Sequence, residues 1–222
     1  MSDAPLLAGP VFGLRSWRVA AGPDGEVLSS LHRTTGWPPG GQWLRAQCGA
    51  GRDHEVPAGG CICGVHAWHP SRASTRRVLA SRFEVPGIVA GAGAIEVHPE
   101  GFRAERARPH AFAALPGRNR RLLERLAARH DAQVVDVRGP DDLLAYCREH
   151  GLGLGEDVVD GLLGPGTVAR LRDARRHRMR RDVGRVAAAA AVSAGLFAAG
   201  LAFVTDDGPK DLVGRTGKVH VP

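Results

Sequence analysis

The sequence predicts an α+β protein in which a small antiparallel β-rich domain is followed by a helical, α/β segment and a single C-terminal transmembrane helix. Short apolar runs between Gly/Pro turns fill the first part, helical periodicity marks the second, and an uncharged run marks the third. We therefore expect a β-rich domain at 1–116, an α/β helical segment at 117–166, an Arg-rich juxtamembrane stem at 167–185, a transmembrane helix at 186–204 and a short extracytoplasmic tail at 205–222.

Alternating apolar and polar residues predict five strands in the first part. They span residues 12–20, 27–32, 43–48, 87–96 and 101–107. Turn sequences rich in Gly and Pro separate these runs. The last two strands form a predicted hairpin around His98-Pro99-Glu100-Gly101, because charged residues alternate with Phe102 and Ala104 after that turn.

The second part shows helical spacing. An amphipathic stripe over residues 119–130 includes Leu122, Leu123, Leu126 and Ala127. A short strand at 133–137 and a helix at 141–150, ended by Gly151, follow it. A third helix is expected at 156–163, before Gly164-Pro165.

Residues 186–204 carry no charge, amide or proline. As a helix they span about 28 Å at ~1.5 Å per residue, which matches the hydrocarbon layer of a bilayer. An alanine-rich buried or surface helix is the alternative interpretation, but the run lacks the polar face that a surface helix needs. Arg185 precedes the run and Asp206 follows it. The pattern predicts a single-pass membrane anchor.

The flanking charges predict the orientation of this anchor. Eight arginines and two aspartates lie between Arg170 and Arg185, close enough to the helix to keep their side cytoplasmic. The N-terminal 185 residues are therefore expected in the cytoplasm, tethered to the cell (inner) membrane. The same arginines can bind anionic membrane lipids, at about 1 kcal/mol per residue. Small residues at Ala191, Gly195 and Ala199 offer a face for a homodimer.

The basic excess is local, which argues against a nucleic-acid partner. The chain has a formal charge of +7 and a pI near 10.2, but the Arg-rich stretch alone contributes +6. The nearly neutral remainder is a poor electrostatic match for a polyphosphate. Trp17, Trp37 and Trp43 interleave with arginines and could stack single-stranded bases, but aromatic residues of a β-sheet core with the arginines on the opposite face are the favoured interpretation. Nucleic acid is therefore not the expected partner.

One cluster of residues has possible chemistry: Cys48, His54, Cys61 and Cys63, with His66 nearby. Thiols and imidazoles are ligands that zinc prefers, and four suffice for a closed tetrahedral site. If Ile62 is extended, the two cysteines beside it point to one face. Without a secretory signal, the four cysteines of the chain are expected to be reduced thiols or ligands rather than disulfides.

Three other interpretations of this cluster stay open. The thiols can be small buried hydrophobes, they can hold a [2Fe–2S] cluster, or the C-x-C pair can act as a dithiol switch. Cys147 lies in a helical pattern among leucines and is expected in the core. The signatures GxSxG, HExxH and the P-loop are missing from the sequence, so no catalytic residue and no reaction are predicted.

Four segments carry a resemblance: GLRSWRV, WPPG, the C…HEVP…CxCGVHA stretch and GAIEVHPEGFRAERARP. Together they resemble an uncharacterised family of actinobacterial proteins with a C-x-C-G-[IV]-[YH]-A motif and a G-[YF]-R-A-E-x-A-x-P segment. The match covers about Leu14 to Leu115, and it departs from the family at Ala94-Ile95-Glu96, where many members have an apolar-Trp-Gly run. The resemblance implies a shared small β-rich domain in which Cys61 and Cys63 act as a unit. It implies no activity.

These features predict a membrane-tethered cytoplasmic adaptor or regulatory module with an unknown protein partner and a structural zinc site at Cys48, His54, Cys61 and Cys63. The alternative is a membrane-bound redox or sensor protein that uses a [2Fe–2S] cluster or the C-x-C thiols.

Overall fold

The computed structural model describes residues 9–23, 25–31, 35–170 and 173–174. Residues up to Ala169 form one compact unit, and a second unit, Arg170–Pro222, is almost wholly outside the described residues. The predicted transmembrane helix, the tail and most of the stem fall there. In the part of the chain that is described, no helix is long and apolar enough to cross a membrane.

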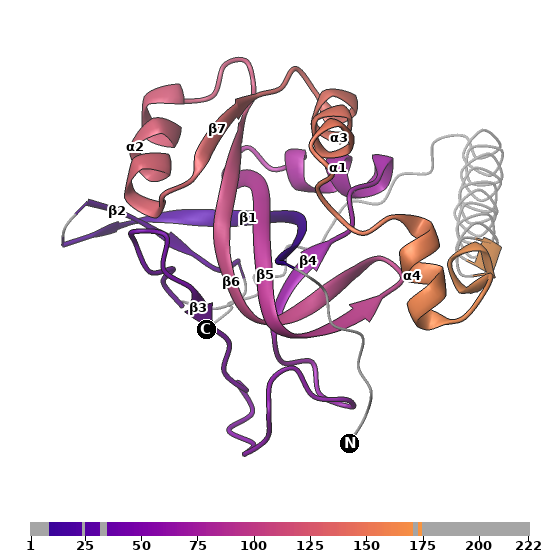
Figure 1. Ribbon diagram of the computed structural model, residues 1–222. Coiled ribbons are helices and arrows are strands. Elements are labelled where there is room, and N and C mark those ends of the chain that lie inside the picture. Colours follow the sequence, from indigo (N-terminus) through magenta and orange to yellow (C-terminus); the bar gives the residue numbers. More distant parts are fainter. Residues whose placement is uncertain (1–8, 24, 32–34, 171–172, 175–222) are drawn as a thin grey trace, which may run out of the picture. The chain divides into compact units, whose positions relative to one another are not determined.

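The described residues form a seven-stranded sheet with four helices that are described over their full length (Figure 1). The strands are β1 (Val11–Gly22), β2 (Gly25–Ser29), β3 (Leu44–Arg45), β4 (Val65–Trp68), β5 (Val85–His98), β6 (Gly101–Ala114) and β7 (Gln133–Asp136). The helices are α1 (Arg72–Leu79), α2 (Arg120–His130), α3 (Pro140–Glu149) and α4 (Glu156–Leu163). Antiparallel pairing dominates and helices gather toward the C-terminal half, so the predicted α+β class is confirmed.

The predicted hairpin is the centre of the sheet. β5 and β6 lie side by side as an antiparallel pair (Figure 1). They turn at His98 and Gly101, and Phe102 is opposite Val97. Both strands are longer than the sequence predicted. β5 extends by two residues at each end, and β6 continues through Pro109 to Ala114. The register shifts at this point, since Ile88 pairs with Ala111 while Val89 pairs with Pro109. A bulge is one of the few places where a sheet tolerates proline.

Helices cover both faces of the sheet near the ends of β6 and β7. On one face, Leu123 and Leu126 of α2 pack in a core cluster with Trp17 and Phe112. On the other face, Val78 of α1 and Leu143 and Cys147 of α3 join the second core cluster. Its buried members are Leu14, Val78, Ile88, Ala111, Ala113, Val137, Leu143 and Cys147. Adjacent residues of β6 therefore point into different cores, as the strand period of two requires.

β7 pairs with β6 in parallel, opposite residues 111–114. The connection between these two strands is α2, as a parallel pair requires a crossover. The Asn119 side chain caps α2 by accepting a hydrogen bond from the backbone N–H of Leu122 at 3.1 Å. The predicted parts at 1–116 and 117–166 thus contribute to the same sheet.

Two elements were not predicted from the sequence. β4 is only four residues long, and α1 has few apolar residues to reveal a stripe. The start of α1 is nevertheless encoded, because Ser71 and Ser74 form a reciprocal capping box. Serine stands where Glu or Gln usually marks this motif, so the pattern is difficult to recognise in the sequence.

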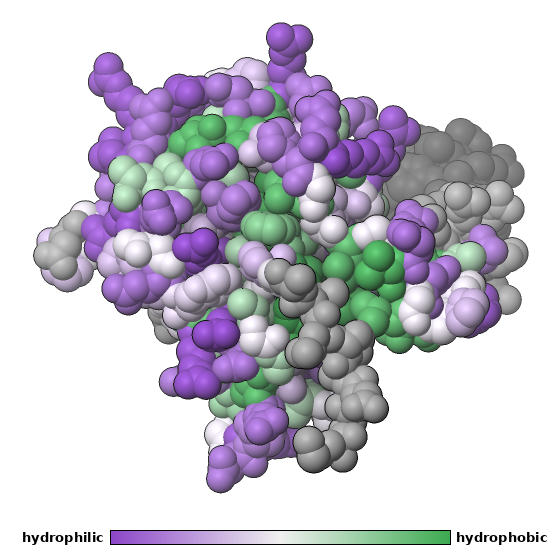
Figure 2. All heavy atoms as spheres, viewed as in Figure 1, coloured by the Kyte–Doolittle hydropathy of each residue, from purple (hydrophilic) through white to green (hydrophobic). Residues whose placement is uncertain are grey.

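Most of the visible surface is hydrophilic (Figure 2). A group of hydrophobic residues is visible where α4 lies against β5. On α4, Val159 is buried while Val158 and Leu162 are partly exposed. The helix therefore covers β5 with one side and leaves apolar atoms on its edge.

Candidate metal centre

The Cys/His residues lie in a loop that interrupts one strand. β3 and β4 both pair with β6, in the same direction and at successive positions. The backbone N–H of Ala46 donates to the carbonyl of Glu105 at 2.8 Å, and Val65 returns directly opposite Ala104. The intervening residues 47–64, which we call the Cys/His loop, form a long excursion between neighbouring positions on β6 (Figure 1).

The Cys/His loop has no hydrophobic core of its own. Cys63 is its only buried residue, and the one large apolar side chain beside it, Ile62, is 84% exposed. Ordering a segment of this length costs conformational entropy, which buried apolar area normally offsets. Burial does not supply that free energy here, so the loop needs another constraint.

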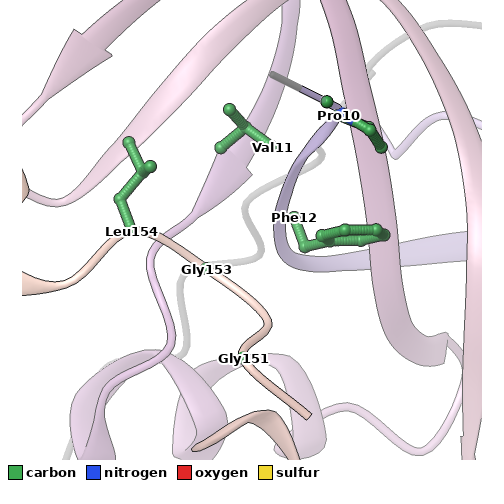
Figure 3. A pocket seen from close by; sticks show the side chains of 7 residues that line it. Pro10, Val11, Phe12, Gly151, Gly153 and Leu154 are labelled. Atoms are coloured by element: carbon green, nitrogen blue, oxygen red, sulfur yellow. The ribbon is translucent and has the colours of Figure 1, made fainter. Parts of the chain in front are cut away.

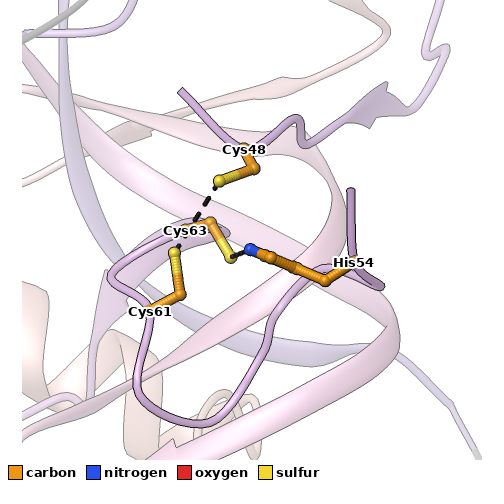
Figure 4. Close-up of side chains that lie close together, drawn as sticks. All are labelled: Cys48, His54, Cys61 and Cys63. Carbon is orange, nitrogen blue, oxygen red and sulfur yellow. Dashed lines mark hydrogen bonds between the residues drawn. The ribbon is translucent and has the colours of Figure 1, made fainter. Parts of the chain in front are cut away.

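Four soft donors meet inside this loop (Figure 4). The donor atoms of Cys48, His54, Cys61 and Cys63 all lie within 4.8 Å of one another. The Sγ atoms of Cys48 and Cys61 are 3.7 Å apart, and Nε2 of His54 lies 4.0 Å from Sγ of Cys63. Two thiolates bound tetrahedrally at about 2.3 Å from one zinc ion are about 3.8 Å apart. The donor set therefore has the size of a single tetrahedral ion.

The local backbone conformation orients the side chains of Cys61 and Cys63. Cys61 and Cys63 direct their sulfurs into the same cluster of donors (Figure 4). Ile62 between them is exposed to solvent. The backbone N–H of Cys61 donates to the carbonyl of Ala58 at 3.1 Å and closes a turn around Gly60, whose φ is +76°. A glycine adopts that conformation without strain. The sequence-based prediction that the C-x-C pair acts together agrees with this geometry.

His54 is oriented by its own backbone neighbour. Its Nδ1–H donates to the carbonyl oxygen of Glu55 at 2.7 Å, which leaves Nε2 as the lone-pair nitrogen facing the thiols. Metal-binding histidines usually have their second ring nitrogen fixed in this way. The Glu55 hydrogen bond also raises the pKa of His54, with a smaller contribution from Cys61.

The thiols differ in acidity. The pKa of Cys61 falls to about 6, chiefly because the backbone N–H of Cys63 donates to its sulfur, with further help from the neighbouring side chains. Burial raises the pKa of Cys63, and the adjacent Cys61 raises it further. A thiolate at Cys61 is thus present at neutral pH, and thiolate is the form that binds metals.

A buried arginine on β6 donates hydrogen bonds to the backbone of the Cys/His loop. Arg103 is 6% exposed and donates through Nη1 to the carbonyl oxygens of Cys61 and Cys63, the latter at 3.1 Å. Its Nη2 binds the Glu96 carboxylate, which stands directly opposite it on β5. The sequence pattern placed Arg103 on the polar face of the hairpin, which is correct, but nothing in the pattern indicated that the Cys/His loop covers that face.

Other sequence candidates lie elsewhere. Nε2–H of His66 donates to the carbonyl of Ile62 at 2.9 Å, so His66 stabilises the loop without joining the four donors. Cys147 is buried in the second core, as predicted, and burial raises its pKa to about 11. Trp17 and Trp37 are buried edge to face, which agrees with a core role and removes them as stacking platforms for bases.

One shallow hollow of about 220 Å³ lies between the start of β1 and the segment after α3 (Figure 3). Its lining is Gly9, Pro10, Val11, Phe12, Gly151, Gly153 and Leu154. These residues include no acid, base or nucleophile, so the hollow has no groups for general acid–base or covalent catalysis.

Comparison of the chain with protein families, with curated proteins and with solved structures finds no match.

Proposed function

We propose that this protein is a membrane-tethered cytoplasmic adaptor or regulatory module whose Cys/His loop is held by a structural zinc ion bound to Cys48, His54, Cys61 and Cys63. The observation that carries the zinc site is the convergence of four soft donors in a loop without a core. Zinc sites of this kind supply the free energy that a small segment cannot obtain from apolar burial.

The spacing of the donors favours one ion over an iron–sulfur cluster. A [2Fe–2S] cluster distributes its four ligands over two irons, so the two pairs of ligands stand farther apart than ligands on one ion. Here all four donor atoms lie within 4.8 Å. Three cysteines and one histidine also match the Cys₃His set of structural zinc sites.

Four protein ligands on one ion favour a structural zinc site, as in an adaptor, over the catalytic zinc site of an enzyme. A catalytic zinc keeps one position open for water or substrate, whereas four protein ligands fill a tetrahedral ion. The tether is the uncharged run at 186–204, with the arginines of the stem as its contact with anionic lipids and the tail outside the cytoplasm. A homodimer through the small residues of this run is compatible with the same role.

Metal analysis of the full chain, purified in detergent without chelators, tests the proposal. We expect a colourless protein with one equivalent of zinc, and loss of that zinc in Cys61→Ser. Cys147→Ser is the matched control, because it removes a cysteine outside the cluster and should leave zinc bound. Protein that contains neither zinc nor another metal would contradict the site.

The redox alternative has one observation in its favour. Cys48 and Cys61 lie with their sulfurs 3.7 Å apart, and the lowered pKa of Cys61 gives a reactive thiolate beside a second thiol. Visible colour and iron in the purified protein would support a [2Fe–2S] cluster. Metal-free protein in which Cys48 and Cys61 interconvert reversibly between dithiol and disulfide would support a thiol switch.

The tether is tested separately. After alkaline carbonate extraction, the full chain should remain in the membrane pellet, because a spanning helix is not released by disrupting surface charge contacts. Release into the soluble fraction would remove the tether from the proposal and leave the zinc site untouched.

A further inference from the structure

The outward side of α1 and the turn after it form a basic surface. Residues 71–83 contain four arginines and neither Asp nor Glu: Arg72, Arg76, Arg77 and Arg82. All four are exposed, while the opposite side of α1 is buried through Ser74, Thr75 and Val78. The helical spacing therefore places positive charge on one exposed side.

Two carboxylates stand near these arginines, Asp141 and Glu84; Glu84 follows Phe83 in the chain and interacts with Arg118. Arg72 contacts Asp141 at 3.1 Å, in a pair whose two side chains are both exposed, so screening by water leaves it weak. The guanidinium of Arg77 stacks over Trp68 at 4.4 Å from the ring centre. Within the described part of the chain, Arg76 and Arg82 have no carboxylate partner.

An ordered turn displays an aromatic ring beside this charge. Phe83 is 94% exposed, the highest value among the large apolar side chains of the described residues. Arg118 donates to the carbonyl oxygens of Ser81 and Glu84, which bracket Phe83, and the backbone N–H of Phe83 donates to Ser81 Oγ at 3.3 Å. These hydrogen bonds hold the turn in a conformation that exposes the phenyl ring to solvent.

We propose that the arginines of α1 together with Arg82 and Phe83 bind the headgroup layer of an anionic lipid bilayer. The proposal rests on the proposed tether, which keeps the domain close to such a surface. Guanidinium groups attract lipid phosphates, and an exposed phenyl ring enters the boundary between headgroups and acyl chains. The basic side of α1 and the ring of Phe83 supply these two contacts from adjacent positions in the chain.

A single-stranded nucleic acid fits this surface less well. Such ligands are held by several aromatic side chains along a groove that follows the phosphate backbone. The α1 surface is a helix side with one exposed aromatic ring, and Trp68 is covered by Arg77. It offers a polynucleotide one exposed aromatic ring for stacking.

Hydrogen–deuterium exchange on the full chain tests the proposal. The protein is placed in nanodiscs of phosphatidylcholine alone or of phosphatidylcholine with phosphatidylglycerol, and uptake is followed over residues 72–85. We expect slower exchange in the anionic discs only, and loss of the difference at high salt. If carbonate extraction has shown that the chain is not inserted, vesicles of the same two compositions are added to the soluble protein, so failure of the tether and failure of this surface are separate results.

Substitutions test which residues contribute to docking on the anionic bilayer. Each arginine contributes about fivefold near an anionic surface, so Arg76→Gln with Arg82→Gln should lower the ratio of docked to free domain about 25-fold. Phe83→Ser should weaken docking at unchanged charge. Arg18→Gln with Arg121→Gln removes the same charge from exposed positions on β1 and α2, and should have little effect. Equal exchange in both lipids would overturn the proposal, as would protection by a single-stranded oligonucleotide but not by anionic discs.

Discussion

Arg103 Nη1 lies 3.1 Å from the backbone carbonyl oxygen of Cys63 and also donates to the carbonyl of Cys61. Both halves of the C-x-C pair are therefore tied to β6 through a single buried guanidinium. Because Arg103 also binds Glu96 and donates through Nε to Nε2 of His98 at 3.2 Å, its side chain is held from the opposite side by β5. The loop that holds the donors is thus positioned by the central hairpin.

The first prediction concerns this contact. Arg103→Lys keeps the charge but cannot reach two carbonyls and a carboxylate with one planar group. We expect zinc affinity to fall about 10- to 100-fold, as is typical when a residue that orients metal-binding side chains is substituted. Competition with a chromogenic chelator measures the affinity. Arg106→Lys, an exposed neighbour on β6, is the control, and an Arg103→Lys protein with unchanged affinity would show that the loop does not depend on this arginine.

The second prediction separates the two kinds of cysteine. Cys147→Ser buries a hydroxyl among apolar side chains and should lower the free energy of unfolding by about 1–3 kcal/mol, with zinc retained. Cys63→Ser should lose zinc instead. Urea unfolding and metal content are measured on the same samples. Loss of zinc in Cys147→Ser with full retention in Cys63→Ser would reverse the assignment.

The third prediction concerns metal removal. Extraction of zinc with a strong chelator should increase amide exchange across the Cys/His loop, because the loop has one buried residue to hold it. The β5–β6 hairpin should stay protected, since its interior residues are buried in the two cores. Hydrogen–deuterium exchange before and after chelation gives both values. Uniform loss of protection over the whole domain is the contrary result.

The fourth prediction concerns pH. His130 is fully buried, its Nδ1–H donates to the carbonyl of Pro38 at 3.0 Å, and burial lowers its pKa below the ordinary 6.5. Below pH 6.5 the unfolded chain takes up a proton that native His130 resists. Stability from this residue is therefore complete above that pH and is lost as the pH falls toward and through the lowered native pKa.

His130→Asn isolates the effect. An amide N–H can replace Nδ1–H toward Pro38 without titrating, so the variant should lose less stability between about pH 8 and about pH 5. Urea midpoints across this range compare the two proteins, which carry the same Cys/His loop. Parallel curves for wild type and variant would show that His130 does not contribute to the acid sensitivity.

The sequence was informative where local chemistry decides the structure. The leucine stripe of α2, the Asp141-Asp142 start of α3 and the turn at His98–Gly101 each specify an element within a few residues. The four donors could also be named, because thiols and an imidazole grouped in a Gly-rich segment are typical of a metal site. Their convergence within 4.8 Å agrees with that prediction.

Features that depend on tertiary contact were not predictable. Arg103 follows the ordinary alternation of a hairpin, and only the folded loop reveals that it is buried. The pairing of β3 and β4 with neighbouring stretches of β6 is also a long-range property, since β3 has only two residues. Propensity cannot identify strands this short, because their partners stabilise them.

The central claim is that one zinc ion is bound by three thiolates and one imidazole in the Cys/His loop. X-ray absorption at the zinc edge of the purified full chain tests it directly. We expect a first shell of three sulfurs at about 2.3 Å and one nitrogen at about 2.0–2.1 Å. A first shell of oxygen and nitrogen without sulfur would contradict it.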